Sequence, residues 1–164
     1  MSLEIIPVIV KKEIAKGDDL AQIFASNFKE IQDGDIIVIA QKVISNQEGK
    51  LVELAQVIPS MLSVGLASEY NKDAKLIEVI LSEAKRIVRL ENGIIITETK
   101  HGFICANSGV DESNLPLGFA TMLPDDSDGS ARDFADKIFA KTKCRVAVII
   151  SDTFGRPFRE GQTN

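Results

Sequence analysis

Cysteine and histidine are scarce in this chain, and each shortage excludes a class of chemistry. The two cysteines, Cys105 and Cys144, lie far apart in the sequence, so they form neither a disulfide framework nor a close zinc-binding pair. They favour a reducing, cytoplasmic location. His101 is the only histidine and lies in a predicted hairpin turn, so no serine–histidine–acid arrangement can be argued from it.

Positive charge and long apolar runs are also lacking. Lysine and arginine number 19 against 24 acidic residues, a net charge of -5, and no basic stripe is present to follow a phosphate backbone. No segment approaches the roughly 20 consecutive apolar residues of a membrane-spanning helix. The first residues also lack the pattern of a signal peptide. We therefore expect no nucleic-acid partner and no membrane association.

The glycine motifs of the common nucleotide-binding folds are missing as well. Neither a Gly-x-x-x-x-Gly-Lys-Ser/Thr loop nor a Gly-x-Gly-x-x-Gly stretch occurs, which argues against P-loop and Rossmann sites. The hydrophobic residues that are present, 45% of 164, are enough for one domain or two small ones.

Their spacing predicts an α+β fold with mixed or antiparallel sheets and flanking helices. Helical patterns follow the cap at 17–19, extend over 59–86 with a break at 71–73, and begin again at Ser130, the predicted cap of a further helix. Strands are predicted at 3–10 (an edge strand or strand plus bend), 36–40, 87–90, 94–97, 103–106 and 146–150. The strands at 36–40 and 146–150 are continuous apolar runs, typical of buried strands.

Polar residues follow two of these strands. Asp152 and Thr153 come directly after the run at 146–150, and Asp111 lies in the polar stretch 107–114 after another strand. Carboxylate and hydroxyl oxygens suit Mg²⁺ or Mn²⁺, and the two aspartates would converge if their strands were neighbours. The simpler interpretations remain open: Asp152 capping a turn with Thr153 packed, and 107–114 forming a polar loop.

Basic side chains near strand ends are candidates for phosphate contacts. Lys42 lies just past the strand at 36–40, where an ammonium reaches a phosphate as a point charge. Arg156 and Arg159 flank a Pro-Phe pair and suit bidentate anion binding. Exposed surface lysine and arginine side chains are the ordinary alternative for all three.

Four of these segments, taken in order, resemble the coenzyme F420-0:γ-glutamyl ligase family. The matching stretches are GDIIVIAQK at 34–42, CANSGVDESN at 105–114, LPD at 123–125 leading to DGSAR at 128–132, and VIISDTFGRP at 148–157. The resemblance spans essentially the whole chain. It identifies the chain as the N-terminal portion of the ligase, with a C-terminal part apparently absent.

The resemblance implies a GTP-dependent ligase that adds L-glutamate to coenzyme F420-0 through an acyl phosphate. It implies that Asp111, Asp152 and Thr153 bind Mg²⁺ or Mn²⁺, with K⁺ as a further candidate ion, and that Gln41, Lys42 and Asn114 contact the nucleotide. It also implies a homodimer. Such a reaction asks the protein mainly for positioning and charge neutralisation.

The chain departs from the family pattern at two places besides its end. Residues 9–12 replace a Gly-Leu-Pro or Gly-Ile-Pro turn, and Asn46 stands where a second lysine is common. Two other functions remain open at this point. One is a truncated nucleotide-binding domain without catalysis. The other is a metal-dependent phosphohydrolase-like domain. Phe154 argues against it, because such a domain is expected to have a second acid at that position.

Overall fold

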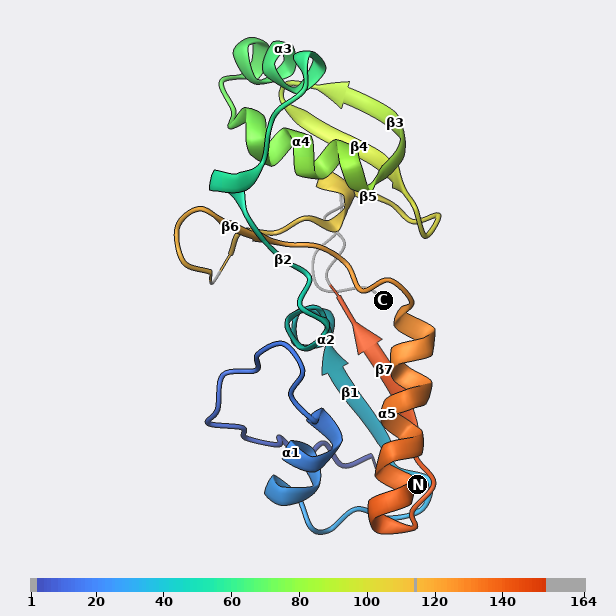
Figure 1. The fold of residues 1–164 in the computed structure, drawn as a ribbon. Coiled ribbons are helices and arrows are strands. Elements are labelled where there is room, and N and C mark those ends of the chain that lie inside the picture. Colours follow the sequence, from blue (N-terminus) through green and yellow to red (C-terminus); the bar gives the residue numbers. More distant parts are fainter. Residues whose placement is uncertain (1–2, 114, 153–164) are drawn as a thin grey trace.

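The computed structural model describes residues 3–113 and 115–152, arranged in two lobes with separate hydrophobic cores (Figure 1). The lower lobe contains strands β1 (Ile36–Ala40) and β7 (Ala147–Ser151), which pair in parallel. Helices α1 (Leu20–Asn27) and α5 (Ser127–Thr142) lie together on one face of this pair. The predicted α+β fold is confirmed.

The lower core explains why α1 and α5 cover the sheet. Its buried residues come from α1, β1 and α5: Ala21, Ile37, Phe134 and Ile138. The start of α1 is fixed by Asp19, whose side chain accepts a hydrogen bond from the Gln22 backbone N–H at 2.9 Å. This agrees with the predicted cap at 17–19, and such a cap contributes about 1 kcal/mol.

The upper lobe is an antiparallel meander covered by two helices. Strands β3 (Ala84–Glu91), β4 (Ile94–Thr99) and β5 (Ile104–Ala106) form the sheet, and α3 (Met61–Tyr70) and α4 (Ala74–Glu83) pack with it. Asn71, with a φ of 51°, ends α3 in the left-handed conformation. The predicted meander and the break in the helical region are both confirmed, but the helical region ends at Glu83 and not at Arg86, because β3 already begins at Ala84.

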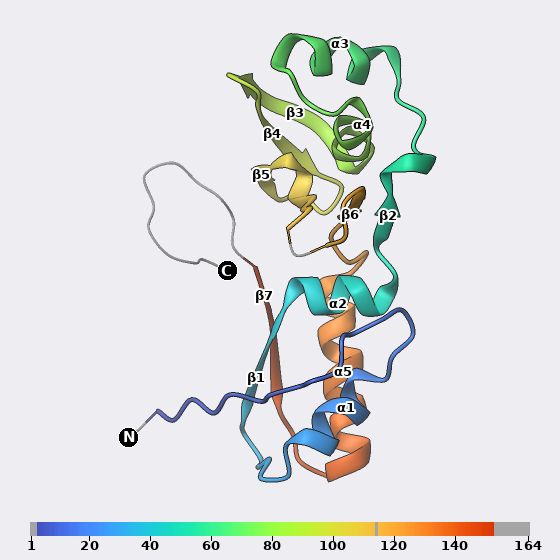
Figure 2. The same cartoon turned by 90° about the vertical axis from the view of Figure 1, so that its left-hand side faces the viewer.

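A short antiparallel pair crosses between the lobes (Figure 2). It consists of β2 (Leu51–Glu53), which follows helix α2 (Gln41–Glu48), and β6 (Phe119–Thr121). Single turns of 3₁₀ helix occur at Leu54–Gln56 and Asn107–Gly109. None of the helices in the described residues is long and apolar enough to cross a membrane.

Three predictions about the elements are wrong. Residues 3–10 form no strand and pair with none of the described strands. Ser130 does not cap α5: Asp126 accepts from the Gly129 N–H at 2.8 Å, and the Ser130 hydroxyl instead donates to Glu48 of α2. The loop predicted over 107–128 contains β6.

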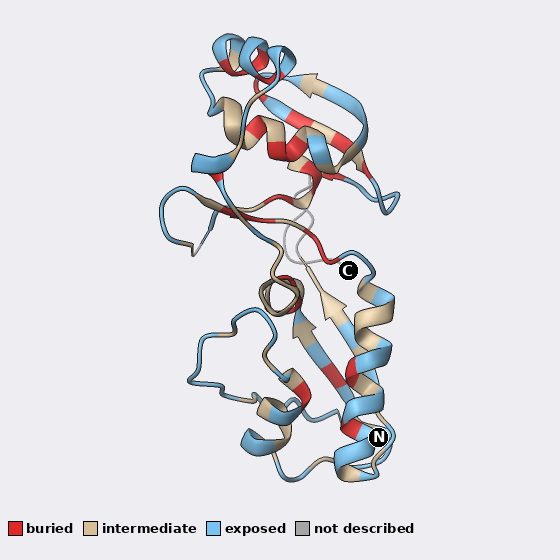
Figure 3. Ribbon diagram, viewed as in Figure 1, coloured by how far each residue is buried: buried red, intermediate tan, exposed pale blue. Residues whose placement is uncertain are grey.

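The two parallel strands are buried on one face and not on both. Ile36, Val38 and Ile149 are exposed, by 62%, 61% and 42% (Figure 3). The register pairs Ile36 with Ala147 and Val38 with Ile149, so these side chains share the face opposite α1 and α5. The apolar runs predicted to be buried strands therefore carry an exposed apolar strip, formed by Ile36, Val38 and Ile149.

Candidate functional site

The parallel pairing of β1 and β7 brings two predicted site residues to one edge of the sheet. Ala40 pairs with Ser151 at the carboxyl end, so Gln41 and Asp152 are the next residue on each strand. Helix α2 begins at Gln41, and within the described chain no side chain caps its first turn. The first backbone N–H groups of α2, which have no partner within the helix, therefore lie beside the strand ends, an arrangement that favours anions.

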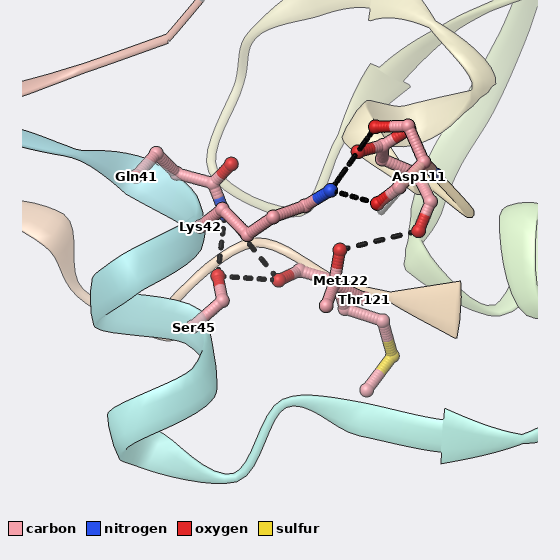
Figure 4. Close-up of polar contacts among 7 residues, drawn as sticks. Gln41, Lys42, Ser45, Asp111, Thr121 and Met122 are labelled. Carbon is pink, nitrogen blue, oxygen red and sulfur yellow. Dashed lines mark hydrogen bonds and ion pairs between the residues drawn. The ribbon is translucent and has the colours of Figure 1, made fainter. Parts of the chain in front are cut away.

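Lys42 extends from this first turn across to the segment around Asp111 (Figure 4). Its Nζ lies 2.5 Å from Asp111 Oδ2 and 3.1 Å from Ser113 Oγ, and it also donates to the Ser113 backbone carbonyl. The Ser113 hydroxyl and backbone N–H in turn donate to the Asp111 carboxylate, at 2.6 and 2.9 Å. Two segments predicted separately thus meet in one polar cluster.

The position of Asp111 is set by the short strand β6. The backbone N–H of Asp111 donates to the Thr121 carbonyl at 3.1 Å, and the Thr121 N–H donates to the Asp111 carbonyl at 2.8 Å. Partial burial opposes ionisation of the carboxyl group, but hydrogen bonds from Lys42 and Ser113 outweigh it and lower the pKa of Asp111. Asp111 is therefore an anion at neutral pH.

Gln41 is oriented by a buried serine. The Ser45 hydroxyl, fully buried, donates to the Met122 carbonyl at 2.7 Å, so its oxygen is left to accept from Gln41 Nε2 (Figure 4). The same Nε2 lies 3.5 Å from the Met122 carbonyl. The amide N–H groups are thus directed into the protein, and Gln41 presents its Oε1, an acceptor, to any ligand.

Asp152 lies near the upper sheet. Burial raises the pKa of the Cys105 thiol to about 11, and the negative charge of Asp152 adds to the rise. β5, which carries Cys105, pairs with β4, whereas β7 pairs with β1. The strands before Asp111 and Asp152 are therefore not neighbours, and the sequence argument for their convergence does not hold.

The remaining predicted residues are placed only in part. Thr153, Asn114, Arg156 and Arg159 lie outside the described residues. His101 is exposed, and its Nε2 lies 3.0 Å from the Asp125 carbonyl. Two functional candidates, Ser45 and Ser113, were not singled out by sequence, because a serine is recognised as a positioning group only once its partners are known.

The oxygen atoms around Asp111 fit a hard divalent cation. A carboxylate, a hydroxyl and a backbone carbonyl converge on one point, where the Lys42 ammonium stands in for a cation. Within 3–113 and 115–152 no group of three or more His, Cys, Asp or Glu side chains is gathered to hold a metal. The carboxylate of Asp111 is therefore accompanied here by neutral oxygens and not by further acidic side chains.

The high pKa of Cys105 makes the stability of the fold pH-dependent. Below pH 9, the ordinary thiol value, neither folded nor unfolded chains ionise this group, and stability is unaffected by it. Between pH 9 and about 11 the unfolded chain ionises first, so the free energy of unfolding falls, by about 1.4 kcal/mol at pH 10 and by at most about 2.7 kcal/mol above pH 11. Urea unfolding at pH 8 and 10 measures the fall. Cys105→Ala should remove it, and an equal fall in that variant would contradict the assignment.

Comparison with known proteins shows the family to which the chain belongs. The family model of F420-0:Gamma-glutamyl ligase matches residues 9–164. The chain belongs to this family of ligases.

Two curated relatives, both named coenzyme F420:L-glutamate ligase, show the extent of the similarity. The protein of Methanopyrus kandleri is 45% identical over 160 residues, which is 98% of this chain and 63% of the relative. That of Methanocaldococcus jannaschii is 53% identical over 131 residues, 80% of this chain and 52% of the relative. The chain thus spans a little under two thirds of the Methanopyrus protein.

Proposed function

We propose that this chain is part of a ligase that joins L-glutamate to coenzyme F420-0 with GTP as the co-substrate. Family membership and the names of the curated relatives support the acid–amino-acid ligation. The observation that carries the nucleotide part is the meeting of Lys42 and Asp111 beside the uncapped start of α2. An ammonium, a carboxylate and free N–H groups together suit a metal-bound phosphate.

In the proposed reaction, a carboxylate oxygen of the precursor attacks the γ-phosphorus of GTP, and GDP leaves. The amine of glutamate then attacks the acyl carbon, the C–O bond to phosphate breaks, and the amine loses a proton. A bound Mg²⁺ or Mn²⁺ supplies charge neutralisation of the phosphates. Asp111 would hold it, with Asp152 and Thr153 as the further proposed ligands, and Lys42 would bind a phosphate oxygen.

The role of Gln41 in this proposal is limited by the orientation of its side-chain amide. Its amide nitrogen donates to Ser45 and lies 3.5 Å from the Met122 carbonyl, so its N–H groups are directed toward these two residues. Its Oε1, which accepts no side-chain hydrogen bond within the described residues, suits a donor such as an N–H of the nucleobase or a ribose hydroxyl. Asn114 remains the third proposed nucleotide contact.

Calorimetric titration of GTP and ATP into the chain, with and without Mn²⁺, tests the nucleotide site. Mn²⁺-dependent binding of GTP supports the proposal. A folded chain that binds neither nucleotide at millimolar concentration would overturn the location of the site within these residues.

A second candidate function is metal-dependent nucleotide binding without ligation, which needs only the groups described. Incubation with F420-0, glutamate and GTP separates the two by the glutamylated product.

Ser45→Ala should weaken both the fold and the nucleotide site. It removes the hydroxyl that donates to the Met122 carbonyl, which costs about 0.5–1.5 kcal/mol of unfolding free energy, and it frees the Gln41 amide to rotate. GTP affinity should fall severalfold. Ser82→Ala, which also removes a hydroxyl donating to a backbone carbonyl, is the control and should leave GTP affinity unchanged. Equal GTP affinity in all three proteins would contradict the role of Ser45.

We also propose that the chain forms a homodimer through the exposed apolar strip. Parallel strands are ordinarily covered on both faces, and the strip leaves Ile36, Val38 and Ile149 in contact with water. Sedimentation velocity should show a dimer for the chain and a monomer for Val38→Glu. Exposed Val64, on α3 of the upper lobe, provides a control as Val64→Glu. A monomeric chain at all concentrations would refute this proposal.

A further inference from the structure

The Lys42 ammonium lies where three oxygen atoms converge. Asp111 Oδ2 is 2.5 Å from Nζ, Ser113 Oγ is 3.1 Å away, and the Ser113 carbonyl accepts a further hydrogen bond from the same nitrogen (Figure 4). The three oxygens use all three donors of a lysine ammonium. We call Asp111 Oδ2, Ser113 Oγ and the Ser113 carbonyl the oxygen cluster.

The contacts of the other lysine–aspartate pair near the site are different in kind. Lys50 contacts the Asp125 carboxylate, whose side chain is 85% exposed, and no other side-chain hydrogen bond of its ammonium occurs in the described part of the chain. The Lys42 ammonium, in contrast, is bound by the Asp111 carboxylate and by two oxygen atoms of Ser113. The oxygen cluster is therefore a small cation site, whereas the Lys50 pair is an ordinary surface ion pair.

An ammonium and a divalent cation cannot occupy the oxygen cluster together. At a separation of 4 Å, charges of +1 and +2 repel by roughly 8 kcal/mol at an effective dielectric constant of 20. The site is open enough for exchange, since the side chains of Lys42 and Asp111 are 26% and 46% exposed. The four-carbon side chain of lysine is also flexible, so the Lys42 ammonium can leave the oxygen cluster without a movement of α2.

We propose that Lys42 is an internal cation that occupies the oxygen cluster in the metal-free chain and is displaced from it by a divalent metal ion. Metal binding then releases the ammonium at the first turn of α2, where the uncapped N–H groups favour a phosphate. Lys42 becomes available to the nucleotide only after the metal has replaced it, and one side chain couples the two binding events. This inference rests on the proposed metal site at Asp111 and adds Ser113 to it.

The first test is titration of Mn²⁺ alone, followed by electron paramagnetic resonance, into the chain, Lys42→Met and Lys50→Met. Lys42→Met should bind Mn²⁺ at least about tenfold more tightly than the unsubstituted chain, because the competing cation is gone. Lys50→Met removes an equal charge and should stay within about twofold. Circular dichroism verifies that each variant is folded. Equal affinity in all three, or no binding to any of them at millimolar Mn²⁺, would overturn the proposal.

The second test follows Lys42 itself. Brief acetylation of the chain with an N-hydroxysuccinimide ester, read by peptide mass spectrometry, should modify Lys42 faster in saturating Mn²⁺ than without it, with Lys50 unchanged as an internal reference. A slower or unchanged rate at Lys42 would refute displacement. Neither test contains nucleotide, so a failure of GTP binding would leave the exchange standing and would count only against the ligase proposal.

Discussion

Asp111→Asn is expected to abolish Mn²⁺-dependent GTP binding in calorimetry. Asparagine keeps the shape of the side chain and its backbone pairing with Thr121, but it removes the negative charge on which a divalent cation depends. The lowered pKa of Asp111 shows that the structure stabilises the anion, chiefly through Lys42 and Ser113 acting against burial. The loss should therefore be at least about a hundredfold in Mn²⁺ affinity.

Stability should hardly change in the same variant. The Lys42–Asp111 pair is partly exposed, and such pairs contribute roughly 0–1 kcal/mol. Asp125→Asn is the matched control, because it also breaks a lysine–aspartate pair near the lobe boundary, and its GTP binding should be unaltered. If Asp111→Asn binds GTP with Mn²⁺ as tightly as the unsubstituted chain, Asp111 is not a metal ligand.

The elements that sequence predicts well here are those with signals inside a single segment. In the region 59–86 the break at Asn71 separates two helices and α4 has an apolar stripe, and the meander has turn residues between apolar runs. The failures concern partners that are distant in sequence. β2 and β6 are three residues each, too short to show alternation, and they pair only because the chain returns after more than sixty residues.

The residues of the candidate site could also be predicted from sequence, whereas the contacts between them could not. Lys42 and Asp111 were identified as candidates from their positions after predicted strands, and Gln41 through the family resemblance. The pairing of β1 with β7 does place Gln41 and Asp152 at one edge. The contact between Lys42 and Asp111 was not predicted, since it depends on β6 positioning Asp111 through Thr121. Helix α2 was missed although Gly49, with a φ of 73°, is the typical residue to end it.

Ile138→Ala and Ile77→Ala are expected to destabilise different parts of the molecule. Both side chains are fully buried, in the lower and the upper core respectively, and each substitution should cost about 2–5 kcal/mol of local stability. The two cores share no buried residue, and β2 and β6 run between the lobes. Each variant should therefore loosen its own lobe first.

Amide hydrogen exchange measures this directly, and the two variants are controls for each other. Ile138→Ala should accelerate exchange in β1 and β7 by at least about tenfold and leave β4 protected, and Ile77→Ala should do the reverse. Because α2 and Lys42 follow β1 whereas Asp111 is held by β6, loosening of the lower lobe would separate Lys42 from the oxygen cluster without unfolding Asp111. Equal acceleration in both lobes by either variant would show that the two cores unfold as one unit.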